Sequence, residues 1–349
     1  MDGNTAFENE YERKLNVILN KNPDKKYLRS FANHISDKAS TTIHAYVSNV
    51  AMFMNRTNKT PAELTLEDYD EMLASIKKCT SSYQITMYTS LKEFSHYLKA
   101  AKLNDDDPMQ YKKRPKAKES KETQVKRENG YLTSNGRNSE ISRFLDTVDS
   151  GIGTHKAKER QKEWRLRDRL IIHTLLNTGM RSAALWKLNV NDVDFERKQI
   201  ISVDKGAKTF TYDLNDSVLE LMKEWIIDRD NKLKSKGVPD DGALFISNRM
   251  KRMSQLAIAD VVKKYSVTIK CKNITPHKLR ATAITTVYEK SGGNLYMAQQ
   301  FAGHSNPKIT EIYIRGQKNS ARKSASEIMG GVINHQMRQI MNEKQKSIK

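Results

Sequence analysis

The sequence predicts a mainly α-helical protein of two domains, the second of which carries a small antiparallel β-sheet. Apolar residues recur at helical spacing between residues 41 and 100, which predicts a bundle of helices. Two short β-prone runs, at 199–203 and 209–214, flank a turn rich in lysine and glycine and indicate a β-hairpin. A basic stretch that is almost free of apolar residues lies between the two regions and separates the domains.

The first domain is expected over residues 1–105. Val47 and Val50 share one helical face, and Thr65 with Asp68 has the spacing of a capping box at the start of the next helix. Aromatic and methionine stripes in this region are typical of a helical core. The first clear helix begins near residue 41, so no separate N-terminal arm-binding domain is expected.

The charge of the chain points to a polyanionic partner. There are 61 basic and 41 acidic residues among 349, a net charge of +20. Lysines and arginines that contact phosphates release condensed counterions and thereby gain affinity. The sequence contains no apolar run near the length that spans a bilayer and no N-terminal secretory pattern. The two cysteines, Cys79 and Cys271, form neither a disulfide framework nor a zinc cluster, which favours a reducing, cytoplasmic setting.

Residues 106–130 are expected to form a basic linker. The segment YKKRPKAKESKETQVKR (111–127) holds eight basic and two acidic residues. This composition is typical of a solvated spacer, and it also suits a chain that lies along a phosphate backbone. The two interpretations are compatible, and both stay open at this stage.

The second domain is expected over residues 131–349, including a C-terminal tail. An apolar helix at 166–176 is expected to end at Gly179, because glycine commonly terminates helices. After the hairpin, residues 216–335 are expected to be mainly helical. The tail is polar and basic, apart from one apolar helical patch at 328–341.

Four local patterns in this domain occur in a fixed order. They are Thr178-Gly179-Met180-Arg181, Lys205 in the hairpin turn, His277-Lys278-Leu279-Arg280, and Gly303-His304 followed nine positions later by Tyr313. Each pattern alone is as often structural as functional. Together they supply what a phosphodiester transition state requires: guanidinium groups for the non-bridging oxygens, a proton donor for the leaving alkoxide, and a nucleophile with a nearby base. No carboxylate cluster for a metal accompanies them, and no cofactor is expected.

The second domain resembles the catalytic domain of the tyrosine recombinases, also called the phage integrase family. The resemblance rests on TGMRSAALWKLNVNDVDF (178–195), VDKGAKTF (203–210), PHKLRAT (276–282) and FAGHSNPKITEIY (301–313). The helical first domain resembles, by length and position, the core-binding domain that precedes the catalytic domain in this family. The resemblance implies that the two domains form a clamp around double-stranded DNA.

The resemblance also implies a role for each residue. Arg181 and Arg280 would clamp the scissile phosphate, and Lys205 would protonate the departing 5′ oxygen. His277 would act as general base and His304 would hydrogen-bond a non-bridging oxygen, while Tyr313 would attack to form a 3′-phosphotyrosyl bond. Lys208 competes with Lys205 as the general acid. The family often has an acidic residue where this chain has Ala184, a departure that bears on the orientation of Arg181.

The function expected is therefore that of a site-specific DNA recombinase, the integrase of a mobile element or phage. It would act as a homotetramer on DNA, an arrangement compatible with accessory DNA-bending proteins. Alternatives are a chromosome-dimer-resolving recombinase, a type IB topoisomerase-like enzyme, and a DNA-binding protein whose catalysis has decayed. Further DNA contacts are expected from Lys112, Lys113, Arg114, Lys208 and Lys278.

Overall fold

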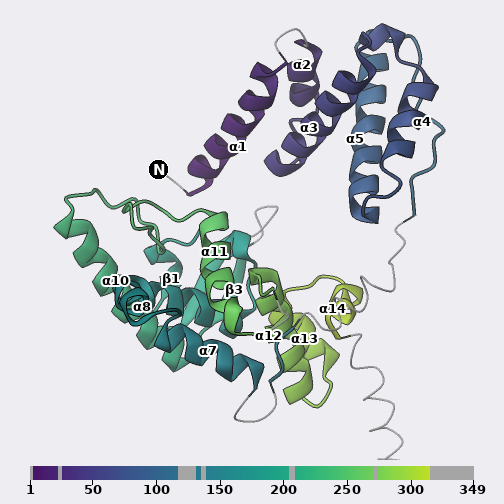
Figure 1. Cartoon of the computed structure of the whole chain (residues 1–349). Helices are drawn as coiled ribbons and strands as arrows, with labels where there is room; N and C mark the ends of the chain where they lie inside the picture. The colour runs from purple at the N-terminus through teal and green to yellow at the C-terminus, as the bar shows by residue number, and fades with distance from the viewer. Residues whose placement is uncertain are drawn as a thin grey trace, which may run out of the picture. The chain divides into compact units, whose positions relative to one another are not determined.

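The computed structural model describes residues 3–22, 26–116, 131–134, 139–203, 209–269 and 273–314 (Figure 1). Within these ranges, side chains are described from residue 12 onward, apart from those of residues 203 and 268. The chain divides into two compact units, 1–121 and 122–349.

The first unit is a bundle of helices around an aromatic core. Its elements are α1 (Gly3–Asn20), α2 (Lys26–His34), α3 (Ser40–Thr57), the 3-10 helix η1 (Pro61–Glu63), α4 (Leu66–Ser75) and α5 (Ser81–Ala100). Phe31, Phe53 and Phe94 are fully buried, and Phe31 meets Phe94 edge-on with ring centroids 5.3 Å apart. The predicted capping box is present, because the Thr65 amide donates to the Asp68 carboxylate at 2.9 Å.

Two helices precede the point at which the sequence indicated a first helix. The expectation of a first clear helix near residue 41 was therefore wrong. Leu19 of α1 and Leu28 and Phe31 of α2 belong to the buried core, and α1 and α2 both pack on α3. Helix α1 is rich in charged and polar residues. Helix α2 is amphipathic, but at nine residues it is shorter than the window over which helical periodicity is recognised.

The start of the predicted linker is packed on the first unit. Met109 is fully buried, and its amide donates to the Ser95 hydroxyl at 3.3 Å. The Tyr88 hydroxyl of α5 donates to the carbonyl of Lys112. The chain thus follows α5 as far as residue 112, while residues 117–130 lie outside the described residues.

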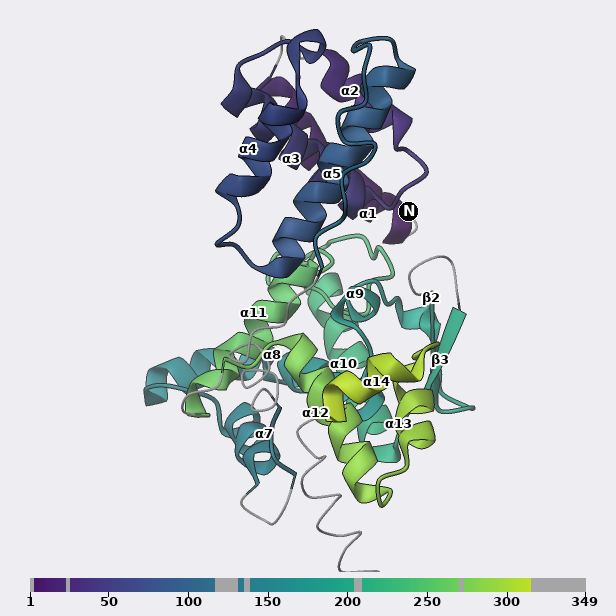
Figure 2. The ribbon, with the colours of Figure 1, turned by 90° about the vertical axis from the view of Figure 1, so that its right-hand side faces the viewer.

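The second unit is predominantly helical, with one small sheet at its edge. Its helices are α7 (Glu140–Ser150), α8 (His155–Thr178), α9 (Ser182–Leu185), η2 (Val190–Asp192), α10 (Asp216–Ser235), α11 (Gln255–Tyr265), η3 (Ser266–Thr268), α12 (Pro276–Lys290), α13 (Leu295–Ala302) and α14 (Pro307–Ile314). Helix α12 packs against α8, α13 and α14. Figure 2 shows α12, α13 and α14 side by side, with β3 next to α13.

The sheet is antiparallel with the order β1-β2-β3. The predicted hairpin is β2 (Gln199–Val203) and β3 (Thr209–Asp213), in which Ile201 pairs with Thr211. The short strand β1 (Val193–Asp194), which the sequence did not indicate, pairs with β2. A two-residue strand is too short to show an alternating pattern.

Two other boundaries differ from the expectations. Helix α8 begins at His155 and not near 166, because Thr154 caps it by accepting a hydrogen bond from the Ala157 amide. Residues 236–254, expected to be helical, form turns and isolated bridges between α10 and α11. No helix among the described residues is both long enough and apolar enough to cross a membrane.

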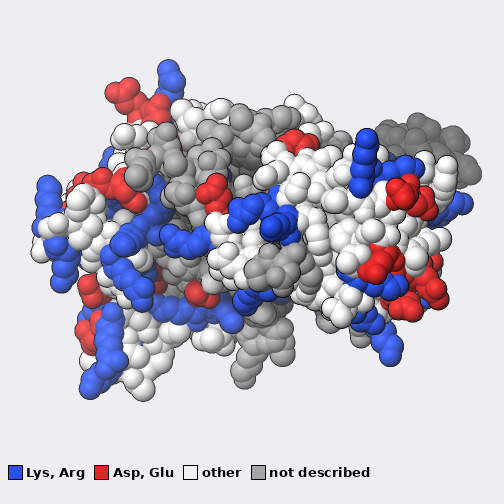
Figure 3. Space-filling model, turned by 90° about the horizontal axis from the view of Figure 1, so that it is seen from above, with Lys and Arg blue, Asp and Glu red and all other residues white. Residues whose placement is uncertain are grey.

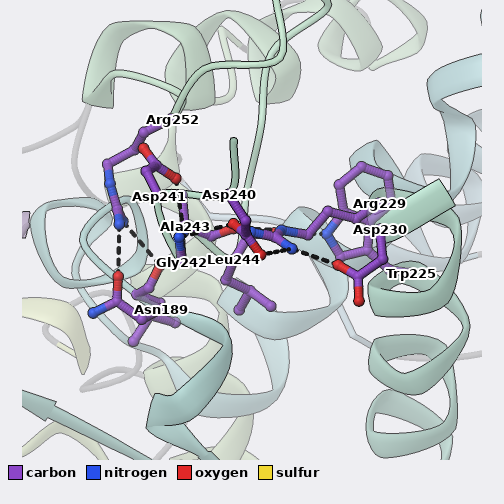
Figure 4. A network of polar contacts seen from close by, with 11 residues as sticks. Asn189, Trp225, Arg229, Asp230, Asp240, Asp241, Gly242, Ala243, Leu244 and Arg252 are labelled. Atoms are coloured by element: carbon purple, nitrogen blue, oxygen red, sulfur yellow. Dashed lines mark hydrogen bonds and ion pairs between the residues drawn. The ribbon is translucent and has the colours of Figure 1, made fainter. Parts of the chain in front are cut away.

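A buried polar network holds this non-helical segment in place (Figure 4). Arg229 of α10 is fully buried, pairs with Asp240 and Asp230, and donates to the carbonyl of Ala243 at 2.6 Å. Arg252 donates to the side-chain oxygen of Asn189 at 2.6 Å and to the carbonyls of Lys187 and Leu188. These contacts join the segment to α10 and to the chain that leads from α9 into the sheet.

Candidate functional site

The site begins at the glycine that ends α8. Gly179 has a φ of +59°, and its amide donates to the carbonyl of Leu175 at 3.0 Å. A Cβ at this position would lie 2.6 Å from the Phe301 ring, so the close packing of α8 on α13 also requires glycine. Arg181 follows as the N-terminal cap of α9 and has an exposed side chain.

Arg280 connects three segments of the site. The predicted HKLR motif opens α12, where Pro276 is the first residue and Thr275 caps the helix through the amide of Lys278. Only 2% of Arg280 is exposed. Its guanidinium donates to the carbonyl of Gly179, to the carbonyl of Ala302 at 2.7 Å and to Nε2 of His304 at 2.9 Å.

Burial and the neighbouring charge of Arg181 lower the pKa of the Arg280 guanidinium. The charge of Tyr313 and a side-chain hydrogen bond to it act in the opposite direction, as does the charge of Tyr212. An arginine remains protonated under such conditions, so two positive charges lie close together in this site. An oxyanion that binds between them relieves their repulsion.

His304 lies at the turn between α13 and α14. Gly303 has a φ of +61°, and a Cβ there would overlap the Phe210 ring of β3, so the hairpin packs directly on this turn. His304 is 6% exposed, and its Nδ1 lies 2.9 Å from the Thr310 hydroxyl. Burial, followed by the charges of Arg280 and Arg181, lowers its pKa to about 4. The ring is therefore neutral near pH 7.

Tyr313 lies on α14 and is half-buried. Its ring stacks on His304 with centroids 5.6 Å apart and an interplanar angle of 15°. The ring of His277 lies on another side at 5.8 Å and 53°. The Thr285 hydroxyl of α12 donates to the Tyr313 carbonyl at 3.2 Å and ties the two helices together at the tyrosine.

The structure thus brings together five of the six predicted residues: Arg181, His277, Arg280, His304 and Tyr313. The sixth, Lys205, and its competitor Lys208 lie outside the described residues. Lys278 is half-exposed in the first turn of α12, and Lys112, Lys113 and Arg114 belong to the first unit.

The sequence did not single out three residues that support the site. Thr310 is fully buried and is hydrogen-bonded to His304. Tyr212 is buried, and its charge raises the pKa of Arg280. Phe210 packs against Gly303. Thr310 precedes Tyr313 by three positions, a spacing that places both on one helical face. That signal was present in the sequence but could not be told apart from ordinary helix packing.

Ala184, the departure noted in the sequence, is buried in α9. His173 lies in α8. Burial, the largest effect, lowers the pKa of His173. The charge of Arg169 lowers this pKa further, and the charge of Asp149 raises it. Its Nε2 is buried and has no hydrogen-bond partner in the described part of the chain, which agrees with a place in the core. Among the described residues, His, Cys, Asp and Glu form no group of three or more that could hold a metal ion.

The model of the phage integrase family matches residues 137–320, which is more than half of the chain. The chain belongs to the phage integrase family. All five clustered residues lie within the matched range, as does the hairpin. Basic side chains are also spread over the face shown in Figure 3, with acidic ones in smaller groups.

Three relatives illustrate the similarity. The tyrosine recombinase XerC of Caldanaerobacter subterraneus subsp. tengcongensis is 26% identical over 332 residues, which cover 86% of this chain and 86% of that protein. The XerH site-specific recombinase in a post-cleavage complex with palindromic difH substrate has a TM-score of 0.63 at 20% identity, covering 90% and 88%. A lambda integrase dimer bound to a COC′ core site has a TM-score of 0.57 at 15% identity, covering 82% and 75%.

The two structural likenesses concern the fold alone, and they confirm the expected fold class: a helical first domain and an α-rich second domain with a small antiparallel sheet. Membership of the family confirms the expected enzyme class, a tyrosine recombinase that cleaves and rejoins DNA strands. Double-stranded DNA is the partner that this class implies.

Proposed function

We propose that this chain is the integrase of a mobile element or phage, a site-specific DNA recombinase that acts through a 3′-phosphotyrosyl intermediate. The observation that carries the proposal is the arrangement of Tyr313. Its ring is stacked on His304, and His304 is hydrogen-bonded to the buried guanidinium of Arg280. A nucleophile, an imidazole and a fixed positive charge thus meet at one point where a phosphate can bind.

In the proposed mechanism the two arginines hold the scissile phosphate. Arg280 is held by three protein acceptors, so its positive charge is already positioned for the transition state. Arg181 is exposed and approaches from the start of α9. Negative charge grows on the non-bridging oxygens as phosphorus becomes pentacoordinate, and paired guanidinium groups stabilise it.

Proton transfers complete the step. The bond from Tyr313 Oη to phosphorus forms and the bond from phosphorus to the 5′ oxygen breaks. The tyrosine proton passes to His277, the other imidazole beside the ring, and Lys205 gives a proton to the 5′ oxygen. His304 donates a hydrogen bond to a non-bridging oxygen. A 5′-hydroxyl from a partner strand then reverses the step, so the energy of the phosphodiester is conserved.

The experiment that tests this proposal is a trapping assay. A nicked suicide substrate made from DNA that flanks the gene should yield a covalent protein–DNA adduct with the wild-type chain. Tyr313→Phe should abolish the adduct, whereas Tyr296→Phe should not, because Tyr296 is an exposed tyrosine on α13. An adduct with Tyr313→Phe would refute the nucleophile assignment. The absence of any wild-type adduct would favour a DNA-binding protein without catalysis.

The proton donor has its own test. Lys205→Ala should block cleavage of an ordinary phosphodiester and regain it on a 5′-phosphorothiolate, because a thiolate leaves without a proton. Lys208→Ala should cleave both substrates. The opposite pattern would assign the role of general acid to Lys208.

A second candidate function is the resolution of chromosome dimers. It is favoured by the XerC relative, whose match covers 86% of both chains. Sequencing of covalent adducts formed on genomic DNA separates the two functions: an integrase marks the ends of its own element, and a dimer-resolving enzyme marks one chromosomal site elsewhere. Relaxation of supercoils without transfer between two molecules would instead indicate a type IB topoisomerase.

We also propose that recombination requires a homotetramer, in which the two domains of each protomer clamp the DNA. Accessory DNA-bending proteins would act on this complex. Cross-linking of the synaptic complex on a two-site substrate should yield four protomers, and a complex limited to two would contradict the proposal.

The basic segment after α5 is proposed to contact the phosphate backbone. Lys113 and Arg114 are exposed, whereas the Lys112 ammonium is paired with Asp70 of the first unit. Neutralising Lys113 and Arg114 should make the slope of log affinity against log salt concentration shallower, by roughly 0.9 for each phosphate contact that is lost. Neutralising Lys112 is the matched control and should change the slope less. Equal slopes for all variants would make the segment only a spacer.

A further inference from the structure

His304 is hydrogen-bonded at both ring nitrogens inside a buried site. Nε2 lies 2.9 Å from Nη2 of Arg280, and Nδ1 lies 2.9 Å from Oγ1 of Thr310. Thr310 is fully buried on the first turns of α14. The ring position is fixed further by Gln299, which donates to the His304 carbonyl at 2.9 Å.

The identities of these partners determine where the proton of a neutral ring lies. A guanidinium nitrogen has hydrogens and no acceptor lone pair, so Arg280 must donate and Nε2 must accept. The ring proton is therefore on Nδ1, which donates to the Thr310 hydroxyl. Burial and the charges of Arg280 and Arg181 keep the ring neutral, consistent with the lowered pKa.

This arrangement conflicts with the proposed task of His304. His304 can donate to a phosphate oxygen only if Nε2 carries a proton. In the protein without DNA, Nε2 carries a lone pair instead. Arg280 has the matching constraint, because both Nη2 hydrogens are used by Ala302 and His304. A phosphate oxygen that accepts one of those hydrogens from Arg280 leaves Nε2 without its donor.

We propose that Thr310 is a positioning residue that allows His304 to move its proton from Nδ1 to Nε2 when a phosphate enters, an inference that rests on the proposed function. Solvent water takes up the proton that leaves Nδ1 and supplies the one that binds Nε2 as the phosphate enters, so the ring stays neutral and no net proton is exchanged. The Thr310 hydroxyl, which first accepts from Nδ1–H, rotates and then donates to the bare Nδ1. A hydroxyl is suited to this exchange because it both donates and accepts.

The charges around the ring favour this neutral exchange over a second protonation. Arg280 faces His304 from α12 and Arg181 acts on it from the start of α9, so an imidazolium would be repelled by two guanidinium groups. Tyr313 of α14 stacks on the ring, and His277 lies on the other side of that tyrosine. Valine at 310 has the shape of threonine but no hydroxyl, and it would leave a buried ring nitrogen without a partner in either state.

The test compares Thr310→Val with Thr310→Ser on the trapping substrate. The valine variant should bind DNA with unchanged affinity and form the adduct roughly 10- to 100-fold more slowly, the effect of one unpaired buried polar group. Serine should restore the rate. Thr282→Val is the matched control for loss of a buried hydroxyl, because Thr282 bonds the Lys278 carbonyl and the Leu132 amide and not His304. Wild-type rates with valine, failure of serine to restore them, or an equal loss in Thr282→Val would overturn the proposal.

Nitrogen-15 NMR of histidine-labelled full-length chain gives a readout that does not depend on activity. The His304 ring should carry its proton on Nδ1 in the free protein and on Nε2 in the DNA complex of Tyr313→Phe. A ring that is already protonated at Nε2 in the free protein, or that keeps its Nδ1 proton in the complex, would also overturn it. Should the wild type form no adduct, the proposed function fails, while the spectrum of the free protein still tests the proton position.

Discussion

Lowering the pH from 7 to 4 should destabilise the second unit through His304. The site lowers the pKa of this ring from 6.5 to about 4, first by burial and then by the charges of Arg280 and Arg181. Between these two pH values the unfolded chain binds a proton that the folded chain excludes. The contribution of the neutral His304 ring to the free energy of unfolding is therefore fully present above pH 6.5, and it is lost as the pH falls toward 4.

The structure sets the size of this effect. Each pKa unit corresponds to about 1.36 kcal/mol, so the change from 6.5 to about 4 gives an upper bound of about 3 kcal/mol. Water near the exposed Arg181 screens part of the repulsion, and we expect about 1–2 kcal/mol. The natural control is His304→Gln, whose amide can accept from Arg280 and donate to Thr310 but does not titrate.

Urea unfolding followed by tryptophan fluorescence provides the assay. The three tryptophans, Trp164, Trp186 and Trp225, all lie in the second unit, so the signal reports its unfolding alone. Between pH 7 and pH 4 the wild type should lose about 1–2 kcal/mol more than His304→Gln. Parallel losses for the two proteins would refute the reasoning, because the histidine would then have the same proton affinity in the folded and unfolded states.

Two further predictions concern packing and the buried network. Gly303→Ala should destabilise the second unit by roughly 2–4 kcal/mol in urea unfolding, since its Cβ would overlap Phe210 in a left-handed backbone conformation. Gly237→Ala has a similar φ of +61° and no atom within 4 Å of the added carbon, so it should cost only about 1 kcal/mol, and equal losses would exclude the overlap as the cause. Arg229→Met should cost roughly 1–3 kcal/mol in thermal melts, because the buried Ala243 carbonyl loses its donor while the half-exposed Asp240 carboxylate can be solvated. Arg229→Lys should recover part of that loss, and a lysine variant no more stable than methionine would contradict the role of charge.

Residues whose signal is local were predictable from the sequence. The Thr65 capping box, the hairpin strands and the glycine at the end of α8 each depend on neighbouring residues, and all three are present. The family resemblance supplied the residues of the site and their order. The structure then brings five of the six together from three segments that are far apart in the chain.

Features that depend on tertiary contacts were not predictable. Nothing in the sequence marks Thr310 as a partner of a histidine, because the contact exists only after the turn at Gly303 brings α14 back against α13. Helix α8 begins in a charged segment, where the Thr154 cap compensates for weak amphipathicity. The choice between Lys205 and Lys208 stays a prediction, since both lie outside the described residues.

The position of Arg280 has a consequence for how inactive forms of this enzyme arise. Its guanidinium joins the carbonyls that end α8 and α13, so removing it leaves two buried carbonyls unpaired as well as the phosphate. Substitution of Arg280 should therefore disturb local order as well as catalysis. Loss of the Tyr313 hydroxyl removes the nucleophile and one side-chain hydrogen bond to Arg280, and it leaves the ring against His304. Inactive relatives of this enzyme that still bind DNA are therefore expected to carry a change at the tyrosine and not at Arg280. For the same reason, Tyr313→Phe is the variant suited to capturing the enzyme on intact DNA.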